Sequence, residues 1–310
     1  MHEVTIVGAG IAGCTAAIYA ARKRMDYALI SETFGGQFLE SGEILNYPGV
    51  TRTDGEVFSE LFERQLEFNK VKPMLGEKIK KIEKIDGGFS LETGKNRYES
   101  KTVIIATGSR PMKLGVPGED EFANKGVTYC SVCDGPLFPD KTIAIIGGGN
   151  SALQGVDFTK NVARQIYLLN INEEFTAHEY LVEKAKAYEN VTVINKARTT
   201  RITGGPFVKG ITYEREGKEV RLAVDGVIIE IGRSPNTDFV KGFLELDERR
   251  HIKIDCQGQT SVEGVFAAGD CASGQEFQYV IAAGQGCIAL LKAARYLANR
   301  QMTDVERSGR

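Results

Sequence analysis

The chain has 310 residues, of which 42% are apolar and 26% charged, and its formal net charge is −2. This length and composition predict two soluble domains, and the balanced charge excludes an electrostatic footprint for nucleic acid. No apolar run is long enough for a membrane span and no room precedes the first strand for a signal peptide, so we expect a cytoplasmic protein without a membrane anchor.

A glycine turn follows the first predicted element. Residues 3–7 are β-rich, a small-residue helix is expected from residue 14 to about residue 24, and residues 27–30 form the next predicted strand. Gly8, Gly10 and Gly13 lie between strand and helix, and Glu32 follows the second strand. This order predicts a dinucleotide fold, in which the glycines let the backbone approach a pyrophosphate and the acid takes the ribose hydroxyls.

The next segment completes the first predicted domain. Residues 35–37 and 46–49 are loops expected over the nucleotide, residues 55–69 form a helix, and edge strands are expected at about 79–85 and 89–91. A buried strand at residues 102–106 ends in Thr107 and Gly108. The expected core stripe of the helix is Phe58, Leu61, Phe62 and Leu66.

A cysteine pair follows, within the run Cys130-Ser131-Val132-Cys133-Asp134. Without a second pair at matching spacing, a Cys-x-x-Cys motif favours reversible thiol–disulfide exchange over zinc, which needs four ligands, and we expect no metal site. One of the two sulfurs is then expected to be an activated thiolate. The other four cysteines, Cys14, Cys256, Cys271 and Cys287, are expected to be small buried hydrophobes.

A second nucleotide-type unit comes next. The strand 142–146 runs into a second glycine turn, Gly147, Gly149 and Ala152, and a helix and the strand 165–169 follow. Beyond it we expect a helix at 178–188, a strand at 191–194, hairpins over 199–222 and a strand at 226–230. Residues 264–270 repeat the strand-to-glycine pattern, residues 279–300 form a long helix, and the tail 301–310 is expected to be frayed.

Taken together, these motifs resemble the low-molecular-weight thioredoxin reductases over essentially the whole chain. The resemblance implies an α/β fold with two Rossmann-like, three-layer ββα nucleotide-binding domains, the second inserted in the first. It places an FAD-binding domain at residues 1–112 and 242–310, and a pyridine-nucleotide-type domain carrying the cysteines at residues 113–241. It also implies a homodimer.

The resemblance assigns roles to individual residues. Cys133 would receive electrons from the flavin, Cys130 would attack the disulfide of the protein substrate, and Asp134 would donate and accept the proton. The alternative for Asp134 is the first residue of an Asp-Gly turn. The residues expected to bind FAD are Gly8, Gly10, Gly13, Glu32, Gly36, Gln37, Asn46, Thr107, Gly108, Gly269, Asp270 and Gln278.

The sequence departs from the family after the strand 165–169. NADPH-using members carry a His-Arg-Arg run and a further arginine there, whereas residues 170–176 hold no cation and include Glu173 and Glu174. Losing two or three charge-assisted hydrogen bonds weakens binding by about a thousandfold, so efficient use of NADPH is not expected. The residues that could still bind a second nucleotide are Gly147, Gly149, Asn150, Ser151, Ala152 and Asn170.

Two donors therefore stay open. Either NADH binds, with Glu173 or Asn170 on its ribose, or the second glycine turn persists for packing alone and electrons come from reduced ferredoxin or a reduced deazaflavin. Phe277 replaces a family arginine beside the flavin and Tyr279 is bulkier than usual, so an aromatic ring either covers the flavin or only adds core packing.

We expect the chain to reduce the disulfide of thioredoxin or a similar small redox protein through FAD. An alternative is an FAD-dependent dithiol oxidase, in which the same cysteines pass electrons from a dithiol to FAD and O2 accepts them. A third interpretation is a flavin-binding redox sensor, for which no further motif in the chain gives support.

Overall fold

In the computed structural model, residues 1–40, 44, 46–274 and 276–308 are described, without the side chains of Glu40, Cys133 and residues 301–308. The chain forms two compact units. Unit 1 comprises Met1–Arg110 and Ser234–Arg310, and unit 2 comprises Pro111–Arg233.

The sheet of unit 1 combines a parallel part with an antiparallel edge. Its order is β2-β1-β5-β4-β3, and β16 also pairs with β5. β5 joins the two parts, because its later residues pair in parallel with β1 and β16 while its first residues pair with antiparallel β4. The strands are β1 (His2–Ala9), β2 (Tyr27–Phe34), β3 (Lys81–Ile85), β4 (Gly88–Glu92), β5 (Arg97–Ile105) and β16 (Val265–Ala267).

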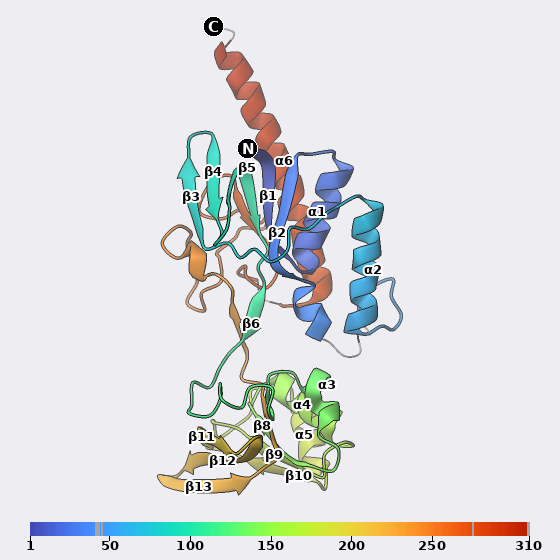
Figure 1. Cartoon of the computed structure of the whole chain (residues 1–310), viewed down its shortest axis with the longest axis vertical. Helices are drawn as coiled ribbons and strands as arrows, with labels where there is room; N and C mark the ends of the chain where they lie inside the picture. The colour runs from blue at the N-terminus through green and yellow to red at the C-terminus, as the bar shows by residue number, and fades with distance from the viewer. Residues whose placement is uncertain (41–43, 45, 275, 309–310) are drawn as a thin grey trace. The chain divides into compact units, whose positions relative to one another are not determined.

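Helices α1 (Ile11–Arg22), α2 (Gly55–Phe68) and α6 (Tyr279–Ser308) accompany this sheet, and α1 and α6 lie side by side (Figure 1). The Asp54 side chain caps α2 by accepting the Val57 N–H at 2.9 Å. Phe58, Phe62 and Leu66 on α2 are buried as expected, but Leu61 is exposed, because the apolar stripe is narrower than the spacing suggested. The loop expected at residues 35–37 becomes the short 3-10 helix η1 (Gly36–Glu40).

Two expectations about α6 were wrong. The helix continues to Ser308 instead of ending near residue 300, because the tail holds no glycine or proline before residue 309. Residues Tyr279–Arg300 are also long and apolar enough to cross a membrane, by length and composition. Core helices of soluble proteins pass the same test, and Ala289, Leu290 and Ala293 are completely buried within unit 1.

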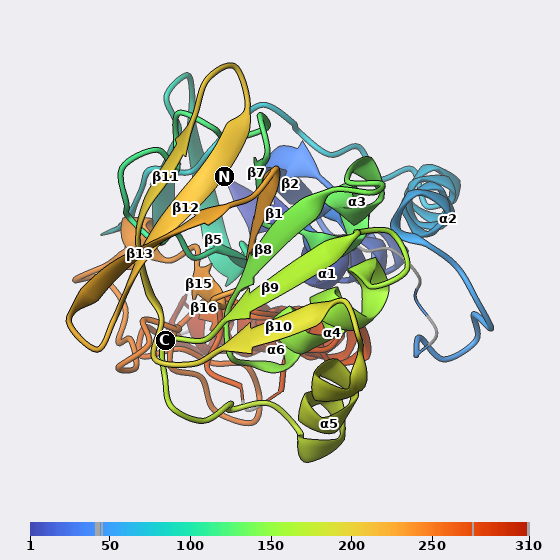
Figure 2. The same ribbon diagram turned by 90° about the horizontal axis from the view of Figure 1, so that it is seen from below.

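Unit 2 is built on a parallel sheet of order β10-β9-β8-β14-β7. Figure 2 shows β8, β9 and β10 side by side, with α4 and α5 next to them. The sheet strands are β7 (Val127–Thr128), β8 (Thr142–Ile146), β9 (Gln165–Leu169), β10 (Val191–Ile194) and β14 (Gly226–Ile229). The helices are α3 (Ser131–Asp134), η2 (Gly135–Leu137), α4 (Asn150–Thr159) and α5 (Glu179–Ala187), and a separate antiparallel sheet contains β11 (Arg198–Gly204), β12 (Val208–Arg215) and β13 (Lys218–Ala223).

Two apolar cores divide unit 2 into three layers. One core joins strand residues such as Ile146 and Val227 to Ile202 and Ile211 of the antiparallel sheet. The other joins Ile145 to helix residues such as Leu153. Alternate residues of a strand point to opposite faces, so Ile145 and Ile146 serve different cores. This confirms the predicted α/β class with three-layer ββα units.

The chain crosses between the units twice. The two connections, β6 (Ser109–Pro111) and β15 (Arg233–Pro235), pair as a two-stranded sheet. The second crossing comes at Ser234, earlier than the expected residue 242. The reason is that Val240, in the short 3-10 helix η3 (Asp238–Val240), is buried in the core of unit 1 together with Leu244.

Candidate active site

The first glycine turn brings α1 against the end of β1. A Cβ at Gly13 would lie 1.7 Å from the Gly8 carbonyl oxygen, and Gly8 has a φ of +107°. Only glycine satisfies both constraints. The Gly10 N-cap is extended and makes no side-chain capping bond, and a Cβ built on it would meet nothing closer than the Gly35 carbonyl oxygen at 3.8 Å. The turn therefore leaves backbone N–H groups and free space at the start of α1.

Expected FAD-binding residues from distant segments meet beside this turn. Gln37 Nε2 donates to Asp270 Oδ2 at 2.6 Å and to Ser109 Oγ at 3.0 Å. Asn46 Nδ2 donates to Gln278 Oε1 at 3.1 Å. The structure thus gathers four of the expected polar groups into two hydrogen-bonded pairs, and their amide and carboxylate groups are suited to ribityl hydroxyls and ring edges.

Three other expected residues make different contacts. Thr107 Oγ1 donates to the Asn236 carbonyl oxygen at 2.8 Å, and the Gly108 carbonyl accepts the Asn236 N–H at 2.9 Å. These bonds tie the end of β5 to the returning chain. Glu32, expected on the ribose, is exposed and pairs with Lys78 at 2.9 Å.

The cysteine loop is organised by a threonine that sequence reasoning missed. Thr128 Oγ1 accepts the Cys130 N–H at 3.2 Å and donates to Asp134 Oδ2. The Asp134 N–H in turn bonds the Cys130 carbonyl at 3.2 Å. Cys130 is disulfide-bonded. Cys133 belongs to α3, but its side chain lies outside the described part of the chain.

A second missed residue, Glu230, follows β14. Its Oε1 accepts the Ser131 hydroxyl at 2.6 Å and the Ser131 N–H at 3.1 Å. Burial raises the pKa of this carboxyl, and the bonds from Ser131 oppose the rise. An acid that directly follows an apolar strand was the available sequence signal, because strand ends of parallel sheets face functional loops.

The second glycine turn is covered by the loop that follows β9. The Thr176 N–H bonds the Gly148 carbonyl at 2.9 Å, and the His178 N–H bonds Asn150 Oδ1 at 2.8 Å. Asn170, expected to be able to hold a ribose, is completely buried, and its Nδ2 donates to the Glu174 carbonyl at 3.0 Å. Its amide therefore holds the loop in this structure.

Charge on this loop differs from expectation in one respect. Glu173 is exposed and forms an ion pair with Lys196 at 2.7 Å. Lys196 follows β10, so the run 170–176 gave no sign of it. The loop thus lies beside a cation, Lys196, which the Glu173 carboxylate neutralises.

The two unusual aromatic residues lie in different surroundings. Phe277 is 45% exposed and stacks on His251 with ring centroids 5.4 Å apart. The Tyr279 hydroxyl donates to the Gln37 carbonyl at 3.4 Å, and its ring packs near Phe58. Tyr279 therefore contributes to the core beside α2, whereas the Phe277 ring is partly exposed at the surface.

The remaining cysteines only partly match the expectation of burial. Cys14 and Cys271 are completely buried, and burial raises the pKa of both thiols, that of Cys14 to about 12. Cys287 is half-buried, and Cys256 is exposed, because it lies in a surface turn after Asp255. Among the described residues, no cluster of three or more metal-ligating side chains occurs.

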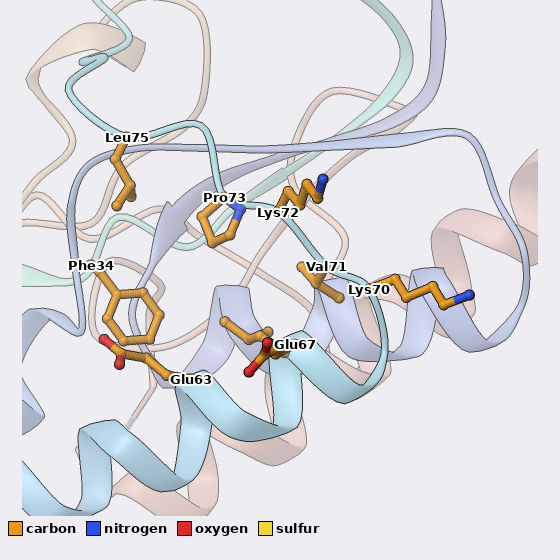
Figure 3. Close-up of a pocket in the computed structure, with 9 residues that line it drawn as sticks. Phe34, Glu63, Glu67, Lys70, Val71, Lys72, Pro73 and Leu75 are labelled. Carbon is orange, nitrogen blue, oxygen red and sulfur yellow. The ribbon is translucent and has the colours of Figure 1, made fainter.

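A separate pocket of about 670 Å³ lies in unit 1 beside the end of α2 (Figure 3). Phe34, Val71 and Leu75 line it, and Glu67 and Lys70 are among its charged lining residues. It contains none of the residues assigned above to FAD, cysteine chemistry or a second nucleotide.

Comparison with known proteins gives consistent matches. The family model described as pyridine nucleotide-disulphide oxidoreductase matches residues 2–287. The chain is 41% identical over 298 residues to an NADH dehydrogenase of Bacillus subtilis, covering 95% of this chain and 58% of that protein. It is 39% identical over 300 residues to a subunit of the alkyl hydroperoxide reductase of Staphylococcus aureus, covering 96% of this chain and 59% of that protein. The chain therefore spans less than two thirds of these curated relatives.

Among solved structures, the chain is similar to thioredoxin reductase from Lactococcus lactis. The TM-score is 0.88 and the sequence identity 30%, with coverage of 96% of this chain and 100% of that chain.

Proposed function

The chain belongs to the pyridine nucleotide-disulphide oxidoreductases, in the class that contains the low-molecular-weight thioredoxin reductases, and from this we propose that it reduces the disulfide of thioredoxin or a similar small redox protein. The reaction would consume NADH and a proton and would convert a partner disulfide into two thiols. What supports this function most directly is the disulfide at Cys130, in a loop that also positions a carboxylate.

FAD fits the residues of unit 1. The free space in front of Gly10 and the uncapped start of α1 suit a pyrophosphate, and Gln37 and Asp270 suit the ribityl chain. Asn46 and Gln278 would lie toward the ring. When bound, FAD would supply two-electron transfer between the donor and the cysteine pair.

The cysteine loop would handle protons and sulfur. Cys130 would attack the partner disulfide and form a mixed disulfide, which Cys133 would resolve by displacing the partner thiolate. Asp134 would deliver the proton to the departing sulfur. The Thr128 hydroxyl holds this carboxylate while also bonding the Cys130 N–H, so one side chain fixes the proton donor relative to the nucleophile.

NADH is the donor that we favour over NADPH. The neutralised Glu173–Lys196 pair offers no unpaired cation for a 2′-phosphate. The name of the Bacillus subtilis relative, NADH dehydrogenase, agrees with this choice. Reduced ferredoxin or a reduced deazaflavin is the alternative, in which case the covered second glycine turn would serve packing alone.

The partner is proposed by its chemistry, a small protein with an accessible disulfide. The name of the Staphylococcus aureus relative makes a peroxide-reducing system a second destination for the electrons. We also propose a cytoplasmic homodimer. Exposed apolar side chains on three helices of unit 1 support a partner surface there, namely Tyr19, Val57, Ile288 and Leu291.

The test is an anaerobic titration of the purified yellow protein. NADH, NADPH, reduced ferredoxin and dithiols are added in turn while the flavin absorbance is followed, and thioredoxin reduction is then assayed with each active donor. We expect bleaching by NADH and loss of thioredoxin reduction in Cys130→Ser and Cys133→Ser. A colourless protein that does not take up FAD, or serine variants with full turnover, would refute the function.

One alternative makes a different prediction in this assay. A dithiol oxidase would be bleached by dithiols and not by NADH, and it would recover its colour rapidly in air while O2 is reduced to H2O2. The cation-poor loop after β9 is the observation that favours this alternative.

A further inference from the structure

A partly buried carboxylate contacts Ser131, the first of the two residues between the cysteines. Glu230 Oε1 accepts both the N–H and the hydroxyl of Ser131, at 3.1 and 2.6 Å. Ser131 is 3% exposed and is the first residue of α3, directly after Cys130. The Glu230 backbone N–H extends β14 by bonding the Ile146 carbonyl at 2.8 Å. The carboxylate is therefore fixed to the sheet at one end and to the cysteine loop at the other.

Two glycines make room for this arrangement. A Cβ at Gly155 of α4 would lie 2.3 Å from Ser131 Oγ, and a Cβ at Gly147 would lie 2.2 Å from the Glu230 carbonyl oxygen. Larger residues at either position would push Ser131 or Glu230 out of place. The contact is thus built into the packing of unit 2 and does not depend on a mobile surface side chain.

The contact has a direct consequence for the adjacent sulfur. N–H groups at the start of a cysteine-containing helix lower the pKa of the preceding thiol, because they stabilise its thiolate. Glu230 accepts the first of these N–H groups and so brings its negative charge to the residue directly after Cys130. Both effects disfavour a thiolate at Cys130.

A thiolate-stabilising environment makes a disulfide more oxidising, because the reduced form gains stability. We propose that Glu230 is a positioning residue that keeps the Cys130/Cys133 couple reducing by withholding this stabilisation from Cys130. The inference rests on the proposed function, in which the couple must pass electrons onward to a partner disulfide.

Charged groups near Glu230 come from its own strand end and from the cysteine loop. Arg233 lies three residues after Glu230, and its positive charge lowers the pKa of the Glu230 carboxyl. Burial raises that pKa more strongly. From the cysteine loop, the titratable groups nearest to Ser131 in sequence are Tyr129, Cys130, Cys133 and Asp134. The Tyr129 hydroxyl is bonded to Glu119 at 2.9 Å, and the Asp134 carboxylate is bonded to Thr128. From α4 and β8, the packing neighbours Gly155 and Gly147 carry no charge.

The experiment measures the couple by itself. Purified holoprotein is equilibrated with glutathione mixtures at pH 7, quenched with acid and alkylated, and the peptide carrying both cysteines is quantified by mass. Reduction of the disulfide takes two electrons and two protons from two glutathione thiols, which become one glutathione disulfide. Glu230→Gln removes the charge, and Glu230→Ala also releases the Ser131 N–H.

In both variants we expect the equilibrium to shift toward the dithiol by about tenfold, which corresponds to about 30 mV for a two-electron couple. We also expect a lower pKa of the Cys130 thiol, measured from the pH dependence of its alkylation rate. Asp225→Asn is the matched control. Asp225 directly precedes β14, is also partly buried and accepts the N–H of Thr142, so its loss removes a comparable carboxylate of unit 2 that has no bond to the cysteine loop among the contacts described.

Each outcome has a distinct meaning. If the Cys130/Cys133 disulfide of the unchanged protein is not reduced by any glutathione mixture, the proposed function is refuted together with this inference. If the unchanged protein is reduced reversibly, but the disulfide–dithiol equilibrium and the Cys130 thiol pKa are the same in every folded Glu230 variant, the inference alone is refuted. An equal shift in Asp225→Asn also refutes it, because the effect would then be general. Should Glu230→Gln fail to fold, Glu230→Ala and Glu230→Asp, in which the carboxylate retracts from Ser131, give the same comparison.

Discussion

The first glycine turn allows a prediction that separates folding from cofactor binding. Gly13→Ala places a Cβ 1.7 Å from the Gly8 carbonyl oxygen, whereas real Cβ atoms essentially never come within 3.0 Å of another heavy atom. Helix α1 must therefore move away from β1 by about 1 Å or more. Overpacking of this kind costs about 1–3 kcal/mol of the free energy of unfolding, even without FAD.

Gly10→Ala is the matched variant. Its Cβ meets only the Gly35 carbonyl oxygen, at an ordinary 3.8 Å, so the apoprotein should lose no more than about 0.5 kcal/mol. The same methyl group would occupy the space proposed for the pyrophosphate. Losing one or two charge-assisted hydrogen bonds to it weakens FAD binding by about a hundredfold.

The assay combines urea unfolding of both apoproteins with FAD titration followed by quenching of flavin fluorescence. We expect Gly13→Ala to be destabilised without FAD, and Gly10→Ala to be stable but to bind FAD weakly. Normal FAD affinity in Gly10→Ala would refute the proposed position of the pyrophosphate. An undiminished stability of apo Gly13→Ala would refute the close-packing argument.

Three further predictions concern unit 2. Glu173→Gln frees Lys196 from its exposed ion pair, so kcat/KM for NADPH should rise about threefold while that for NADH stays level; a fall for NADPH would contradict the argument. Thr128→Val should slow thioredoxin reduction about tenfold by releasing the Asp134 carboxylate, measured in single turnovers, and Thr128→Ser should restore the rate. Hydrogen bonds from Lys160 and then Tyr188 lower the pKa of Asp157 to about 2. The contribution of Asp157 to the free energy of unfolding is therefore present above the unfolded pKa near 3.9 and is lost as the pH falls through about 2. Asp157→Asn should therefore cost about 1 kcal/mol at most at pH 7 in urea unfolding, because the pair is partly exposed, and the difference from the unchanged protein should vanish below about pH 2.

Strands of unit 2 were predictable because they are continuous apolar runs between loop signals. The bounds of β8, β9 and β10 agree with the sequence expectation. The helix containing Leu61 was also predicted, but the exposure of that side chain was not, since burial depends on which distant element covers a position. The same reason explains the exposed Cys256.

The candidate site shows the same division. Glycine spacing and the cysteine motif are local patterns, so they could be read directly from the chain. Thr128, Lys196 and Glu230 act through contacts with residues whose proximity depends on the fold, and Glu230 lies far along the chain from its partner Ser131. Asn170 was an expected ribose ligand, and only the structure shows that its amide is enclosed by its own loop.

The split of unit 1 along the chain constrains how the protein forms during synthesis. β5 can pair with β16, and α1 can pack against α6, only after the ribosome has translated all of unit 2. Unit 2 is a continuous segment and can fold as soon as it emerges, as domains generally do. The nascent part of unit 1 meanwhile exposes the apolar side of α1 to solvent and to chaperones. Substitutions in unit 2 that delay its folding should therefore lower the yield of correctly assembled unit 1, even where they touch none of its residues.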